Sequence, residues 1–163
     1  MLEKDFSIFN WNPRGLNDVK RRDVVCDLVQ SPPSHLVCLQ ETKLQNVDDF
    51  TAAHLGGHRL KNFAQRPAIG TRGGILLLWD ENEVQVSDIV TATYSISATV
   101  CIVGSDISFK LTTVYGPTRS NLKADFYNEL VASKPTPGTL WLLTGDFNQI
   151  YKANDKKDRK SVV

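Results

Sequence analysis

Residues 36–43 read Leu-Val-Cys-Leu-Gln-Glu-Thr-Lys, and this stretch decides how the rest of the chain is arranged. Four consecutive apolar residues that follow a pair of prolines are typical of a short buried strand. The run then changes at once to polar residues, with Glu41 as its first carboxylate. The stretch therefore predicts a strand inside a sheet that places a charged side chain at the end of that sheet.

On the N-terminal side of this strand, the pattern predicts another strand and then a helix. The apolar run 6–11 reads as a strand, and a proline and a glycine break it. Asn17 or Asp18 then caps a helix over residues 19–30, which ends before the two prolines. The apolar face expected for this helix consists of Val25, Leu28 and Val29.

The C-terminal side is rich in strands. A short helix over residues 47–55 comes first and is closed by two glycines. Continuous or alternating apolar runs then predict four strands, at 74–79, 84–93, 96–103 and 107–115. The last two strands are separated by a short turn with a glycine, so they form a hairpin.

The end of the chain predicts one more helix and one more strand. Ser120 or Asn121 caps this helix, whose expected apolar face is formed by Leu122, Phe126, Leu130 and Val131. A last buried strand covers residues 140–143. The order β-α-β, several strands and then α-β indicates a mixed α/β domain with antiparallel pairing.

The composition indicates one globular domain. The chain has 163 residues, of which 41% are hydrophobic and 23% are charged, and its formal net charge is +1. We expect the domain to cover residues 1–151 and the charged segment 152–163 to form a tail. The balanced charge gives no overall basic field of the kind that marks many nucleic-acid-binding proteins.

The cysteines and the apolar runs limit the cellular context. Cys26, Cys38 and Cys101 lack a Cys-x-x-Cys spacing, so we expect no zinc site and assign all three to core packing. The first residues lack the long apolar run of a secretory signal. The longest uninterrupted apolar run, 75–79, is too short to span a bilayer. We therefore expect a nuclear or cytoplasmic protein that is neither secreted nor inserted into a membrane.

Polar residues follow four of the predicted strands directly at their C-terminal ends. They are Asn12, Gln40 with Glu41, Tyr115, and Asp146 with Asn148. Strands have to end somewhere and polar residues are common at such ends, so each position alone carries little weight. In α/β sheets, however, ligand sites gather at strand ends. The carboxylate and amide oxygens of this set suit Mg²⁺, or Mn²⁺ in its place, and do not suit zinc.

Four motifs then resemble a known family, in the family's order and spacing. They are NWNPRGLN at 10–17, CLQETK at 38–43, TVYGP at 113–117 and GDFN at 145–148. The chain resembles the endonuclease/exonuclease/phosphatase family. The residues of its motifs are most similar to those of the endonuclease domain of plant LINE-type retrotransposons. The resemblance implies a four-layer α/β sandwich, in which two mixed and mostly antiparallel sheets are flanked by helices.

The resemblance also implies roles for individual residues in the Mg²⁺-dependent cleavage of phosphodiester bonds in DNA. Glu41 is the main metal ligand, with Asn12 beside it. Tyr115 contacts the phosphate, Asp146 orients or deprotonates the attacking water, and Asn148 holds the phosphate or Asp146 itself. Two basic residues, Lys43 and Arg14, are expected to contact the substrate, although solvent exposure alone is the better explanation of Lys43.

One family motif is absent from these 163 residues, namely the terminal Ser-Asp-His. We therefore expect the sandwich to be incomplete at the C-terminus, with exposed sheet edges, and catalysis to be weak or lacking. The alternative to a retrotransposon endonuclease is a transposon-derived remnant that binds nucleic acid or protein without turnover. A third interpretation is an enzyme with the same fold and a different substrate, such as a phosphatase or a deadenylase.

Overall fold

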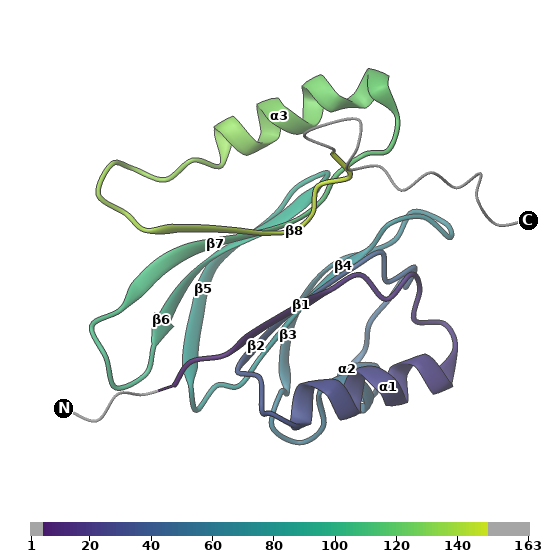
Figure 1. Ribbon diagram of the computed structural model, residues 1–163, viewed down its shortest axis with the longest axis vertical. Coiled ribbons are helices and arrows are strands. Elements are labelled where there is room, and N and C mark those ends of the chain that lie inside the picture. Colours follow the sequence, from purple (N-terminus) through teal and green to yellow (C-terminus); the bar gives the residue numbers. More distant parts are fainter. Residues whose placement is uncertain (1–4, 150–163) are drawn as a thin grey trace, which may run out of the picture.

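The computed structural model describes residues 5–149, which form two packed β-sheets with helices on their outer faces (Figure 1). The first sheet contains β1 (Ile8–Trp11), β2 (Leu36–Gln40), β3 (Asn62–Arg66) and β4 (Ile75–Trp79). The second contains β5 (Val84–Thr91), β6 (Ser95–Ile102), β7 (Ser108–Tyr115) and β8 (Trp141–Asp146). The helices are α1 (Val19–Gln30), α2 (Asp49–Gly56) and α3 (Lys123–Ala132), the last preceded by the 3₁₀ turn η1 (Ser120–Leu122). The predicted α/β sandwich of four layers is confirmed.

The two sheets have matching layouts. The strand order is β1-β2-β4-β3 in the first sheet and β5-β6-β7-β8 in the second. Each sheet has one parallel pair, β1 with β2 and β7 with β8, while its other pairs are antiparallel. A helix joins each parallel pair, α1 in the first sheet and α3 in the second. Both sheets are thus mixed and mostly antiparallel, as predicted.

The hydrophobic core has two parts because the first sheet is covered on both faces. One part lies between the two sheets and contains Leu36, Cys38, Leu77, Ile96 and Leu111. The other lies between the first sheet and helices α1 and α2. Successive residues of a strand point to opposite faces, so one run such as 36–39 supplies side chains to both parts.

The strongest patterns of the sequence give the most accurate boundaries. The helix predicted over residues 19–30 is found with the same bounds, and the Asp18 carboxylate caps it by accepting from the Lys20 amide. Strand β3 was not predicted. Its sequence, Asn-Phe-Ala-Gln-Arg, is half-buried at every position, so it lacks the apolar run or alternation that marks a strand.

Several predicted faces are wrong in detail. Leu28 is 42% exposed and Val131 is 72% exposed, so neither belongs to the buried face of its helix. Helix α3 has no side-chain cap from Ser120 or Asn121, because η1 occupies those positions. Strand β8 is half-buried instead of buried. Most of β5 is exposed, since it is an edge strand that a bulge interrupts after Ser87.

The prediction that all three cysteines pack in the core holds for one of them. Cys38 is buried between the sheets, whereas Cys26 and Cys101 are partly exposed. Cys26 lies on α1 beside the buried Val25, and Cys101 lies on the outer face of the second sheet. Alternation along the chain does not tell whether a helix covers an outer face, which is why these two positions were misjudged.

The two sheets leave an apolar groove where the edge strands β1 and β8 approach each other. The groove has a volume of about 340 Å³, and its lining includes Phe6, Ile8, Ile107 and Leu140. Leu140 is 65% exposed. Among residues 5–149, no helix is long and apolar enough to cross a membrane.

Candidate active site

Four strand ends meet at one side of the sandwich and bring together the polar residues that follow them. Strands β1 and β2 contact β8 across the interior, and β2 also contacts β7. Asn12 follows β1 and lies between Glu41, which follows β2, and Asp146, which ends β8. The side-chain nitrogen of Asn12 donates to Glu41 Oε2 at 3.0 Å and to Asp146 Oδ2 at 2.9 Å. One amide therefore joins carboxylates that come from the two different sheets.

The loop that carries Glu41 is fixed to the start of β4. The backbone N–H of Thr42 donates to the carbonyl of Gly74 at 3.2 Å, and that of Lys43 donates to the carbonyl of Gly73 at 2.8 Å. Gly74 has a φ of 96°, and a side chain there would overlap the Thr42 hydroxyl. The loop can approach β4 this closely only because Gly74 has no side chain. Lys43 Nζ in turn lies 3.7 Å from Glu41 Oε1.

The segment that carries Asp146 is fixed in a similar way to the end of β7. The backbone N–H of Asn148 donates to Asp146 Oδ1 at 3.0 Å, and its side-chain nitrogen donates to the carbonyl of Gly116 at 2.7 Å. The N–H of Gly116 donates to the carbonyl of Asp146 at 2.7 Å. A side chain at Gly116 would overlap the backbone of Phe147. Asn148 thus holds Asp146 in position and is itself held by Gly116.

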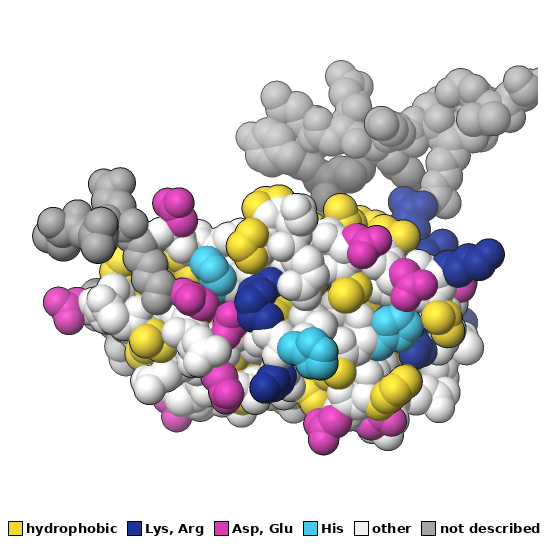
Figure 2. Space-filling model, turned by 90° about the horizontal axis from the view of Figure 1, so that it is seen from below, with side chains coloured by type: hydrophobic (Ala, Val, Ile, Leu, Met, Phe, Trp, Pro, Cys, Tyr) yellow, Lys and Arg dark blue, Asp and Glu magenta, His cyan; other side chains and the backbone are white. Residues whose placement is uncertain are grey.

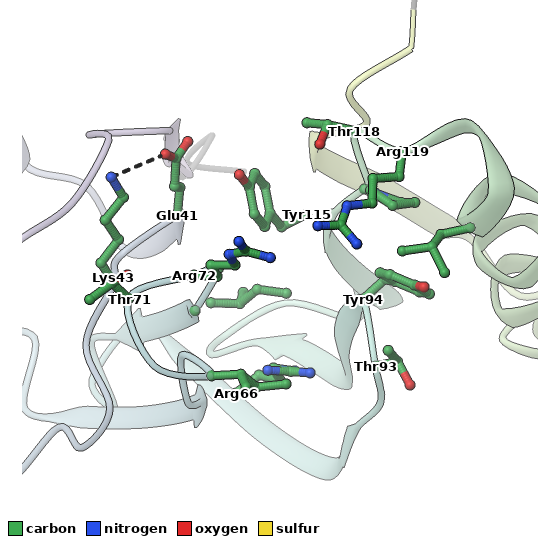
Figure 3. A pocket seen from close by; sticks show the side chains of 17 residues that line it. Glu41, Lys43, Arg66, Thr71, Arg72, Thr93, Tyr94, Tyr115, Thr118 and Arg119 are labelled. Atoms are coloured by element: carbon green, nitrogen blue, oxygen red, sulfur yellow. Dashed lines mark ion pairs between the residues drawn. The ribbon is translucent and has the colours of Figure 1, made fainter.

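Tyr115 ends β7 and projects into the space beside Glu41 (Figure 3). Burial raises the pKa of Tyr115, and so do the charge of Glu41, a hydrogen bond to that carboxylate and the charge of Asp146, which together bring the pKa to about 12. A phenol with such a pKa keeps its proton throughout the neutral range. Tyr115 is therefore a hydrogen-bond donor in this site and not a base.

Backbone strain is concentrated at the same place. Five non-glycine residues in the described part of the chain have a positive φ, between 49° and 57°. Four of them lie in the loops of the site: Arg14, Glu41, Lys43 and Asn148. A non-glycine residue in this region costs about 1–3 kcal/mol, and such residues cluster at functional sites, where the surrounding contacts hold them. The strain is independent support for a functional role of these loops.

The motifs predicted seven residues for the site. The structure brings five of them together, and a sixth, Lys43, lies at the border of the site. The five are Asn12, Glu41, Tyr115, Asp146 and Asn148. Arg14 is different, because it lies on an exposed loop beside Asn12 and does not line the cleft next to Glu41. Gln40 also follows the β2 run but turns inward, where its Nε2 donates to Asn10 Oδ1 at 2.7 Å.

The donor set suits a hard divalent cation. Two carboxylates lie on either side of the Asn12 amide nitrogen, and carboxylate oxygens are ligands that Mg²⁺ prefers. Within residues 5–149, no three or more His, Cys, Asp or Glu residues form a group that could hold a metal ion. The Asn12 oxygen already accepts from the Arg14 N–H at 2.9 Å, so its role as a ligand stays a prediction.

A cleft of about 730 Å³ opens directly beside Glu41 and Tyr115 (Figure 3). Its lining includes three arginines that the motifs do not identify, namely Arg66, Arg72 and Arg119. Arg66 and Arg72 lie on either side of the turn between β3 and β4, and Arg119 follows Tyr115 by four residues. The sequence contains a hint of only one of these arginines, because Arg119 lies close to the TVYGP motif.

The family of this chain follows from its sequence match. Residues 5–161 match the endonuclease/exonuclease/phosphatase family, and the chain belongs to that family. The four motifs that resemble it are the segments that the fold brings to one site. A comparison of the chain with curated proteins found no match.

Solved structures share the fold at low sequence identity. The catalytic domain of Xenopus laevis APE2 is 17% identical with a TM-score of 0.71, and the match covers 94% of this chain and 62% of that one. The AP endonuclease LMAP of Leishmania major is 15% identical with a TM-score of 0.67, covering 94% and 58%. D. rerio TDP2 complexed with a single-strand DNA product is 20% identical with a TM-score of 0.64, covering 89% and 61%. The chain thus spans about three fifths of the length of these structures.

Proposed function

We propose that this site hydrolyses a phosphodiester bond of DNA with the help of Mg²⁺, or of Mn²⁺ in its place. The observation that carries the proposal is the Asn12 amide, which joins Glu41 and Asp146 from two sheets at 3.0 and 2.9 Å, beside a protonated Tyr115. The acidic pair can hold a cation, and this cation and the neutral phenol would stabilise the negative charge that a phosphoryl group gains as it reacts.

Each residue has a task that its contacts support. Glu41 would hold the ion, with Asn12 beside it, and the bound ion would neutralise charge on the phosphoryl oxygens. Asp146 is oriented by one hydrogen bond on each carboxylate oxygen, which leaves lone pairs to orient a water molecule and to accept its proton. Tyr115 donates to a phosphoryl oxygen, and Asn148 keeps Asp146 in place.

Two solved structures with this fold support nucleic acid as the substrate class. LMAP is an AP endonuclease, and the D. rerio TDP2 structure contains a single-strand DNA product. The finer proposal of a LINE-type retrotransposon endonuclease, in the nucleus or cytoplasm, is supported by the wording of three motifs: WNPRGLN, CLQETK and GDFNQIY.

A plasmid-nicking assay tests the proposal. The chain should convert supercoiled plasmid to open circles, at a low rate, with Mg²⁺ or Mn²⁺ and not with EDTA. Asp146→Asn should lower the nicking rate about 10²–10⁴-fold, as expected for loss of a positioned proton acceptor. Asp106→Asn is a matched control, because Asp106 is exposed in the turn between β6 and β7. Nicking by the unaltered chain no faster than by Glu41→Gln, with either ion, would falsify the proposal.

A further inference from the structure

We propose that the cleft beside Tyr115 binds the phosphate group that neighbours the scissile one on the same nucleic-acid strand, and that Arg72 and Arg119 hold this phosphate. The inference rests on the proposed function, because it assumes that the scissile phosphate lies at Glu41 and Tyr115. It adds a binding site and two residues that set the substrate class, since a lone phosphomonoester has no neighbouring phosphate to offer.

Positive charge is concentrated in the cleft and not over the protein as a whole. The chain contains 19 basic and 18 acidic residues. The face covered by α1 and α2 shows both signs side by side (Figure 2). The cleft, in contrast, is lined by four basic residues and by Glu41 as its one acidic residue. Such a local excess of one sign in a cleft attracts anions of the opposite sign.

The charges of Arg72 and Arg119 are not used within the described part of the fold. Lys43 is paired with Glu41 at 3.7 Å. The Arg66 guanidinium donates to the carbonyls of Pro67 at 2.7 Å and Ala92 at 3.4 Å. Arg72 and Arg119 have neither an ion pair nor a side-chain hydrogen bond with any of residues 5–149. Their planar donor groups are therefore available to phosphate oxygens, which they match in geometry.

Both arginines sit on segments that are tied to the site. Arg72 belongs to a turn closed by two backbone hydrogen bonds with Ile69, and the next two residues accept from the Glu41 loop. Arg119 follows Gly116, which is bonded to Asp146 and to Asn148. One arginine is thus fixed to the Glu41 half of the site and the other to the Asp146 half. Figure 3 shows their side chains extending into the cleft on either side of the space below Tyr115.

The size of the cleft fits a further nucleotide of a strand. A volume of about 730 Å³ lies within the range of about 300–1,000 Å³ that is common for ligand pockets. Tyr94 adds an aromatic wall, whose ring packs edge-on against Phe126 with centroids 5.6 Å apart. Arginine donors next to an aromatic surface are the usual means by which proteins follow a nucleic-acid strand without reading its sequence.

Binding without metal tests the inference separately from catalysis. The variant is Arg72→Ala/Arg119→Ala, and the probe is a fluorescein-labelled single-stranded oligonucleotide followed by anisotropy in EDTA. Both side chains are exposed, so the variant should fold normally. We expect affinity at low salt to fall about tenfold or more, and the slope of log K against log salt to fall by at least roughly 0.7. Lys20→Ala/Lys61→Ala is the charge-matched control, because both lysines are exposed and lie outside the cleft.

Hydrolysis supplies the second arm of the test. A dinucleotide has one phosphodiester and no neighbouring phosphate, so the double variant should cleave it as fast as the unaltered chain does. For a longer oligonucleotide, the variant should show a higher KM with little change in kcat. If no chain cleaves any substrate but the variant alone loses binding, the proposed function fails and only the strand-binding role of the two arginines stands. Equal binding by variant and unaltered chain, equal loss in the control variant, or no binding by the unaltered chain would each overturn the inference.

Discussion

Each sheet contains one β-α-β unit with a parallel strand pair: β1, α1 and β2 in the first sheet, and β7, α3 and β8 in the second. The two sheets differ in the side chains that they present to their helices. The outer face of the first sheet presents buried apolar side chains to α1 and α2: Val37, Leu39, Leu76 and Leu78. The outer face of the second sheet presents buried hydroxyl groups on the side of α3: Ser95, Ser97 and Thr112. Phe126 of α3 is fully buried and packs its ring against Tyr94 and Phe147. Hydrogen bonds also join the second sheet to this helix.

Glu129 of α3 is the centre of those hydrogen bonds. Its carboxylate accepts from the backbone N–H of Thr93 at 2.8 Å, from that of Tyr94 at 2.9 Å and from the Ser95 hydroxyl at 2.9 Å. A hydrogen bond to a charged group contributes about 1.5–3 kcal/mol net, about as much as the burial of one large apolar side chain. Helix α3 has one buried residue, whereas α1 and α2 together have five. We therefore expect the α3 layer to open before the α1–α2 layer.

This difference divides the site between a firm half and a weaker half. Glu41 and Asn12 follow strands of the first sheet, while Tyr115 and Asp146 end strands of the second. The Asn12 amide joins the two halves. Motion in the α3 layer would thus displace Tyr115 and Asp146 relative to Glu41.

The largest expected effect is the loss of apolar packing in the first layer. Leu78 is fully buried between the first sheet and its helices. Leu78→Ala should lower the free energy of unfolding by about 2–5 kcal/mol, because it removes buried contacts and leaves a cavity. Urea denaturation measures the change. Leu28→Ala on α1 is the control and should lower stability much less, since Leu28 is 42% exposed. Similar losses in both variants would contradict the packing described for this layer.

A smaller effect is expected from the carboxylate of the second layer. Glu129→Gln removes the charge that strengthens three hydrogen bonds, so it should cost about 1–3 kcal/mol. Hydrogen exchange should locate the loss in α3 and in the turn between β5 and β6. Asp125→Asn on the same helix is the control, because Asp125 is exposed and makes no bond to the sheet. If α1 exchanges faster as well, the two layers are not independent.

A still smaller effect should follow from a change on the outer face of the second sheet itself. Thr112 Oγ1 lies 2.9 Å from the Ser97 hydroxyl and accepts from Trp141 Nε1 at 3.0 Å. Thr112→Val keeps the shape and removes both bonds, so stability should fall by about 0.5–1.5 kcal/mol. Thermal unfolding and tryptophan fluorescence report the change. An unaltered midpoint would show that hydroxyl bonding does not hold this face together.

The smallest effect concerns thiol reactivity and leaves stability unchanged at neutral pH. Burial raises the pKa of the Cys38 thiol from 9.0 to about 12. Below pH 9, both the folded and the unfolded chain keep this proton. Between pH 9 and pH 12, only the unfolded chain loses it, so the free energy of unfolding should fall in that window. At pH 8, Cys26 and Cys101 should react with a thiol reagent and Cys38 should react only after unfolding. Three reacting thiols in the folded protein would contradict the burial of Cys38.

Local patterns were enough to predict the elements that carry strong periodicity. The helix at 19–30 has a capping aspartate, apolar residues at helical spacing and two prolines after it, and its bounds are found as predicted. The run 36–39 forms the centre of β2. Strand β3 and the exposed face of α3 escaped prediction because partial burial leaves only a weak pattern in sequence.

The sequence by itself determined the family, the sandwich of two sheets and the identity of the residues at the strand ends. Only the tertiary structure decided how those residues meet. Asn12 and Asp146 are separated by 134 positions, and their bond at 2.9 Å exists because two sheets pack with their parallel pairs facing each other. The same packing turned Gln40 inward and brought Arg72 and Arg119 to opposite sides of one cleft. Periodicity reports the burial of each element, whereas distances between elements depend on how their faces fit together.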